Sequence, residues 1–166
     1  EIHRSMLPPT GPFTFDESEL WRDARPVQVG NSRAWVPSDV HQLLHLSVHF
    51  AWSHMFSGMG RTVRDIATIL AAGPIDWAQF TDLAIRTRAG TCAYWTLAVT
   101  RTLAGTPVPA EVLESLRPRQ PLAGQQHVLK LDEIRTSNFW QCGDGSLCVH
   151  VQVRTGRCRA RAHIEI

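Results

Sequence analysis

One segment, residues 39–56, most constrains what this chain can fold into. Its apolar residues recur about every 3.6 positions, which is the period of an α-helix. Ser38 or Asp39 is suited to cap its first turn. The apolar positions cover nearly the whole circumference, with one face formed by Val40, Leu44, Val48, Ala51 and Met55, and the other side by Leu46 and Phe50. A helix that is apolar on almost every side is buried among partners, so this segment predicts the central helix of a bundle.

Glycine and proline divide the residues that follow into four further helical segments. The first ends at Gly73-Pro74, where glycine supplies a left-handed cap and proline cannot continue the helix. Asp76 is suited to cap the next segment, which we expect to end at Gly90. The four segments cover residues 61–72, 75–89, 91–104 and 109–116. Five helices joined by short loops predict a mostly α fold with an antiparallel helical bundle over residues 37–118.

The two flanking regions have a different pattern from the bundle. Residues 1–36 predict the end of a strand, a short helix over 16–24 and a hairpin whose strands, 26–29 and 33–36, flank a Gly-Asn-Ser turn. Residues 119–146 are weakly patterned, and 126–135 fit either a helix or a strand. From residue 147 to the end, apolar and polar residues alternate around a Thr-Gly turn, which predicts a β-hairpin in a divergent tail, 119–166.

Composition excludes several classes of protein. Apolar residues make up 43% and charged residues 19%, with a net charge of +2, which is typical of a globular protein. The arginines are scattered along the chain rather than clustered, so we expect no nucleic-acid partner. No apolar run approaches the roughly 20 residues of a membrane span. The four cysteines form no CxxC pair, and we expect free thiols in a cytoplasmic protein.

Histidines provide the candidate chemistry on the central helix. His41, His45 and His49 recur every four residues, and this spacing places their imidazoles in one stripe, the arrangement that binds zinc in HExxH helices. The glutamate of that motif is absent here. A metal or phosphate site would need Asp65 from the next helix, or Glu1 and His3. The alternative is that the histidines border a core helix and bond to neighbours, with Asp65 paired to a nearby arginine or histidine.

Several segments, in order, resemble a family of uncharacterised bacterial nucleotidyltransferases. The resemblance covers about residues 1–118, and its motifs are EIHRSML, ELWRDARPV, PSDVHQLLHLSVHFAWSH, RTVRDIATIL, PIDWAQFTDLA and LAGTPVPAEVLESLRP. It implies a polymerase-β-like α/β core whose end is the segment 1–36, with the helices behind it. The implied chemistry is transfer of a nucleotidyl group from a nucleoside triphosphate to an unknown acceptor, assisted by Mg²⁺.

The resemblance also assigns residues. Glu1 stands where the family's third carboxylate would lie, so it is the candidate catalytic and metal-binding residue. His3, His45, His49 and Asp65 are the candidate substrate-binding residues. The bundle's expected role is to bind or orient the acceptor.

The one Gly-Ser pair, Gly145-Ser146, is followed by no carboxylate pair, so the Gly-Ser loop and D-x-D pair of such enzymes are absent from this sequence. Because the chain begins with Glu1 and not with methionine, we expect the true start to lie upstream. Because the Gly-Ser loop and D-x-D pair are missing, we expect the chain to be inactive alone. The first alternative is a non-catalytic helical binding module. A second is a metal-dependent helical phosphohydrolase using His45, His49 and Asp65, although the adjacent His-Asp pair of such enzymes is missing. The tail departs from the family pattern, either as a native extension or through a shifted reading frame.

Overall fold

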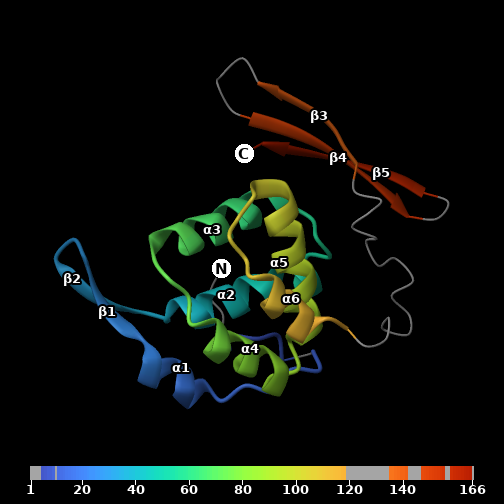
Figure 1. The fold of residues 1–166 in the computed structure, drawn as a ribbon. Helices are drawn as coiled ribbons and strands as arrows, with labels where there is room; N and C mark the ends of the chain where they lie inside the picture. The colour runs from blue at the N-terminus through green and yellow to red at the C-terminus, as the bar shows by residue number, and fades with distance from the viewer. Residues whose placement is uncertain (1–4, 10, 119–134, 142–146, 156–157, 166) are drawn as a thin grey trace.

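The computed structural model describes residues 5–9 and 11–118, together with the backbone of 135–141, 147–155 and 158–165 (Figure 1). The described part contains six α-helices and one π-helix, and it is mostly helical as the sequence predicted. None of these helices is long and apolar enough to cross a membrane. The antiparallel order of the bundle and the identity of residues 1–36 as the end of a nucleotidyltransferase core remain predictions.

The first described elements match the sequence expectation. Helix α1 spans Glu17–Asp23, and the Asp16 side chain caps it by accepting a hydrogen bond from the Ser18 backbone N–H. Strands β1 (Arg25–Val29) and β2 (Ser32–Val36) pair antiparallel. Gly30 has a φ of +58° in their turn, a conformation that glycine adopts without steric cost. The predicted short helix and hairpin are therefore confirmed.

Helix α2, Asp39–Val48, lies at the centre of the helical part, between α3, α4 and α5 (Figure 1). The Ser38 side chain caps it by accepting a hydrogen bond from the backbone N–H of His41. Leu43, Leu44 and Val48 are completely buried. This burial confirms the prediction of a buried, central helix for the first half of the segment, residues 39–48.

The second half of this segment differs from the prediction. After Val48 the chain continues as a π-helix, η1 (His49–Ser53), and helical structure stops at His54. Met55 and Phe56 then take positive φ angles. Met55 was assigned to the apolar face, but it lies beyond the helix with 67% of its surface exposed. The assignment was wrong because the wider π turn and this left-handed pair end the 3.6-residue period.

The remaining helices are α3 (Met59–Ala72), α4 (Trp77–Arg86), α5 (Gly90–Ala104) and α6 (Ala110–Leu116). The stop at Gly73 and the Asp76 cap are confirmed, the cap accepting from the Gln79 N–H at 2.9 Å. The expected end of α4 at Gly90 was wrong. Arg88, with a φ of +61°, turns the chain earlier, and Gly90 begins α5 instead.

The core lies where α2, α4, α5 and α6 meet. Its buried side chains come from all four helices and include Leu43, Leu44, Phe80, Leu83, Leu97, Val112 and Leu116. Cys92 of α5 is a free thiol, as expected for this cysteine, and burial raises its pKa to about 11. The thiol is therefore protonated at neutral pH, and the protonated form is a poor nucleophile.

The tail forms a sheet of three antiparallel strands, in the order β3 (Arg135–Gln141), β4 (Leu147–Thr155) and β5 (Cys158–Glu165). The predicted hairpin is confirmed by β4 and β5, whose register pairs Val149 with Ile164 and Val151 with Ala162. Strand β3 was not predicted, because its sequence, RTSNFWQ, does not alternate. Most of the ambiguous stretch, 126–134, lies outside the described residues.

Two glycines that end helices provide a matched test of backbone strain. Gly105 ends α5 with a φ of +62°, whereas Gly73 ends α3 in extended backbone, and an added Cβ meets no atom within 4 Å at either position. We expect Gly105→Ala to lower the free energy of unfolding by about 1 kcal/mol, since only the left-handed conformation is penalised. Gly73→Ala should cause no loss in the same urea titration. Equal losses at the two sites would contradict this explanation.

Candidate functional site

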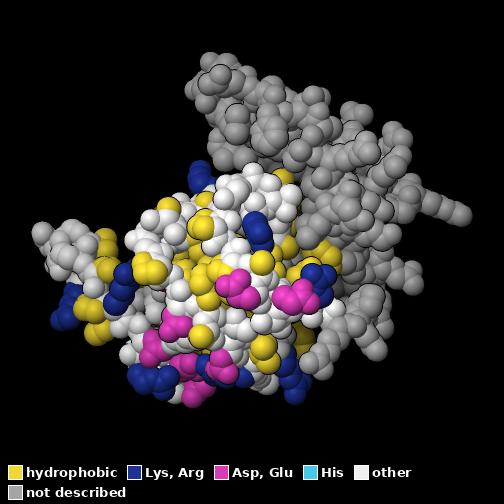
Figure 2. All heavy atoms as spheres, viewed as in Figure 1, with side chains coloured by type: hydrophobic (Ala, Val, Ile, Leu, Met, Phe, Trp, Pro, Cys, Tyr) yellow, Lys and Arg dark blue, Asp and Glu magenta, His cyan; other side chains and the backbone are white. Residues whose placement is uncertain are grey.

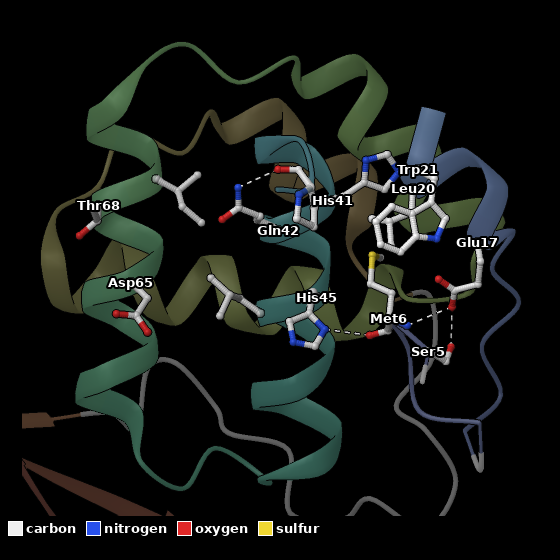
Figure 3. Close-up of a pocket in the computed structure, with 13 residues that line it drawn as sticks. Ser5, Met6, Glu17, Leu20, Trp21, His41, Gln42, His45, Asp65 and Thr68 are labelled. Atoms are coloured by element: carbon white, nitrogen blue, oxygen red, sulfur yellow. Dashed lines mark hydrogen bonds between the residues drawn. The ribbon is translucent and has the colours of Figure 1, made fainter. Parts of the chain in front are cut away.

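A cavity of about 660 Å³ opens between α1, α2, α3 and the segment that contains Ser5 and Met6 (Figure 3). Most of its wall is apolar, with a few polar groups among the apolar side chains. The lining residues include Ser5, Met6, Glu17, Trp21, His41, His45, Asp65 and Thr68. Concave, mostly apolar sites of this size are typical of small-molecule binding, so this cavity is the candidate site.

Glu17 fixes one wall of the cavity. Its Oε1 accepts a hydrogen bond from the Ser5 hydroxyl at 2.7 Å and another from the Met6 backbone N–H at 3.0 Å. These bonds hold the segment that follows residues 1–4 against α1. Glu1 and His3, two of the candidate residues, lie outside the described residues.

His45 joins the same segment to α2. Its Nδ1 lies 2.8 Å from the Met6 carbonyl oxygen, and because a carbonyl can only accept, the Nδ1–H donates. The His45 ring stacks on His49 with centroids 5.4 Å apart, and Nε2 of His49 lies 2.9 Å from Nε2 of His54. The predicted stripe therefore brings His41 and His45 to the cavity, whereas His49 does not line it.

Asp65 lies on the opposite wall, on α3 (Figure 3). Its side chain is 44% exposed, and its Oδ1 is 3.7 Å from Arg64 Nε. The expected pairing with a neighbouring arginine is confirmed. Thr68 lies one turn further along α3 and donates its hydroxyl hydrogen to the Arg64 carbonyl at 2.9 Å. Asp65 and Thr68 thus line the cavity from α3, and His45 lines it from α2.

His41 differs from the other histidines of the stripe, and the sequence reasoning missed its environment. Its ring lies between α2 and α1 (Figure 3) and is completely buried. Its Nδ1 is 2.7 Å from the Ser38 hydroxyl oxygen. Burial lowers the pKa of His41, although Asp23 and Glu19 act in the opposite direction. The sequence feature that could have indicated this environment is the pair Glu19 and Asp23, which lie four residues apart on the preceding short helix.

Three potential metal ligands lie together at the packing of α1 on α2. Within the described part of the chain, Glu19, Asp23 and His41 form the one group of three potential ligands, with their ligand atoms within 4.8 Å of one another. His45, His49 and Asp65 do not form such a group. Mg²⁺ prefers oxygen ligands, but the group of Glu19, Asp23 and His41 contains an imidazole, and no three carboxylates gather within ligand distance of one another among the described residues. The described residues therefore do not fit the Mg²⁺ that the resemblance implies.

Charge on the visible face is mixed rather than concentrated. Acidic and basic side chains are interspersed along the edge formed by α1 and α4 (Figure 2). Ion pairs account for part of this pattern, since Arg86 of α4 reaches both Glu19 of α1 and Asp82. This arrangement is unlike the basic surface typical of nucleic-acid binding.

Comparison with known proteins identifies the family. No curated protein and no solved structure matches the chain. A family model described as "uncharacterised nucleotidyltransferase" matches residues 1–105, a range that holds α1 through α5 and every described residue of the cavity wall. The chain therefore belongs to this family of uncharacterised nucleotidyltransferases.

Proposed function

We propose that this chain is the helical portion of an enzyme that transfers a nucleotidyl group from a nucleoside triphosphate to an acceptor, and that the cavity binds the acceptor. The observation that carries the proposal is the position of the cavity. Its wall includes Ser5 and Met6, directly after the E-I-H motif at which the family resemblance places a catalytic strand end. An acceptor in the cavity would lie beside Ser5 and Met6, which follow His3 of that motif by two and three positions in the sequence.

The cavity's chemistry suits a small organic acceptor. Apolar groups such as Met6 and Trp21 supply contact area, while His45 and Asp65 supply polar groups on two different walls. The hydrogen bond from His45 to the Met6 carbonyl fixes the orientation of the imidazole relative to the segment that contains Ser5 and Met6. Asp65, being partly exposed, is suited to accept a hydrogen bond from an acceptor hydroxyl or amine.

The triphosphate and its Mg²⁺ would be bound elsewhere in the enzyme. We propose that the Gly-Ser loop and D-x-D pair, absent from this sequence, belong to a core preceding Glu1, with Glu1 as an additional carboxylate. On this account residues 1–166 are inactive alone. The described residues contribute acceptor binding and orientation rather than phosphate chemistry.

A melting experiment on residues 1–166 tests this division of labour. With Mg²⁺ present throughout, saturating ATP should shift Tm by less than about 1 °C, because a ligand stabilises only the fold that binds it. A saturable rise of about 5 °C or more would mean that this chain holds the triphosphate itself. That result would contradict the proposal and favour a self-contained nucleotide-binding module.

A further inference from the structure

A cluster of potential metal ligands lies where α1 packs on α2. Glu19 and Asp23 are four residues apart, so both carboxylates project from one face of α1, and His41 meets them from α2. The Glu19 and Asp23 side chains are only 12% and 25% exposed, and His41 is fully buried. Figure 3 shows His41 between the two helices, next to Leu20 and Trp21 of α1.

The second ring nitrogen of His41 provides an independent indication of a ligand. Nε2 is buried and has no hydrogen-bond partner in the described structure. Buried polar atoms are nearly always bonded, and an exception requires an explanation such as a bound ion or water. The Ser38 hydroxyl, 2.7 Å from Nδ1, fixes the ring from the other side, as a hydrogen bond to the far nitrogen does for metal-binding histidines.

Both carboxylates retain an oxygen for an ion. Arg86 and Arg22 approach Oε1 of Glu19, and Arg22 Nε donates to Oδ1 of Asp23. Within the described residues, Oε2 of Glu19 and Oδ2 of Asp23 take part in no hydrogen bond or ion pair. Arg22 is 65% exposed, so its side chain can move into solvent when a cation enters.

We propose that Glu19, Asp23 and His41 bind one divalent transition-metal ion, with Zn²⁺ as the best match. An imidazole with two carboxylates suits zinc, whereas magnesium and calcium select oxygen ligands. In a tetrahedral site with bonds of about 2.0–2.2 Å the ligand atoms stand about 3.4 Å apart, so the cluster contracts by at most about 1.4 Å from its present limit of 4.8 Å. A water molecule completes the coordination.

The site would act as a clamp between α1 and α2. Helix α1 also carries Glu17, Leu20 and Trp21, which line the cavity. Fixing α1 on α2 therefore fixes one wall of the proposed acceptor site. The zinc site does not depend on nucleotide chemistry, and its test below is read without any transfer assay.

The test of this site is the Zn²⁺ affinity of residues 1–166. The protein is first stripped of metal with a chelator, and the affinity is then measured by competition with a chromophoric chelator. We expect Asp23→Asn to weaken a one-per-chain Zn²⁺ site on the order of 100-fold, at the upper end of what even supporting residues contribute. Asp82→Asn is the matched control, because Asp82 also pairs with Arg86 but lies outside the cluster. It should change the affinity by no more than about two-fold, because Asp82 supplies no ligand and an exposed ion pair such as Asp82–Arg86 contributes little.

Two further readouts separate this site from other zinc ligands. Co²⁺ in the proposed site should show no thiolate-to-metal charge-transfer band, because its ligands are nitrogen and oxygen. His54→Gln removes the exposed partner of His49 and should leave the affinity unchanged. The proposal is overturned if zinc binding survives Asp23→Asn, if His54→Gln abolishes it, or if the site sensitive to Asp23 is absent. Circular dichroism of each variant is the control that checks whether the variant is folded.

Discussion

Replacing Phe80 with alanine is expected to lower the free energy of unfolding by about 3–5 kcal/mol, the range for removing a buried aromatic ring. Phe80 is completely buried in the core and packs edge-to-face on Trp77, with ring centroids 5.8 Å apart. The lost ring leaves a cavity between α4 and its partners that the surrounding helices can only partly fill. Since domains of ordinary stability have only about 5–15 kcal/mol in total, this change should come close to unfolding the chain.

Ile85→Ala is the control on the same helix. Ile85 is 57% exposed, so its truncation should change stability by no more than about 0.5 kcal/mol. Both variants are compared with the wild type by urea unfolding, monitored by circular dichroism. A similar loss for the two substitutions would mean that α4 does not present Phe80 to a packed core, contrary to the structure.

The largest functional effect is expected from filling the cavity. In the enzyme read from the complete gene, Thr68→Trp should lower transfer to the acceptor on the order of 100-fold or more, since misplacement by about 1 Å already costs that much. Thr68 lines the cavity from α3, and an indole there would occupy the space assigned to the acceptor. The KM for the nucleoside triphosphate should stay unchanged, because that substrate is bound elsewhere.

Ala71→Trp adds the same ring to α3 at an exposed position that does not line the cavity. It should retain nearly full transfer. If the Thr68 variant retained full activity, or if both variants lost it equally, the cavity would not be the acceptor site. A rise in KM for the triphosphate alone would indicate that the cavity binds the nucleotide instead.

Most helix limits could be predicted because they depend on local chemistry. Ser38 and Asp76 cap their helices through their own side chains, and Gly105 ends α5 in the left-handed conformation. The errors arise where a residue behaves against its local preference. Arg88 and Met55 take positive φ angles that side chains usually avoid, and only the surrounding packing selects those conformations.

The candidate site was only partly predictable for a similar reason. Helical spacing placed His41, His45 and His49 in one stripe, but it could not show that each ring has a different environment. His45 contacts Met6, 39 positions away, and His41 meets α1 across the helix interface. Such contacts depend on how segments distant in sequence pack together. The assignments of Glu1, His3, His45, His49 and Asp65 to substrate or metal binding remain predictions.

The central claim is that these helices complete a nucleotidyltransferase whose phosphate chemistry lies in a preceding core. The most direct test compares residues 1–166 with the protein read from the complete gene, using an α-labelled nucleoside triphosphate, Mg²⁺ and an extract of small-molecule acceptors. We predict that the complete protein transfers label to a small molecule and that residues 1–166 alone transfer none. Transfer by residues 1–166 alone, or a complete protein that contains no Gly-Ser and D-x-D core and transfers nothing, would contradict the account.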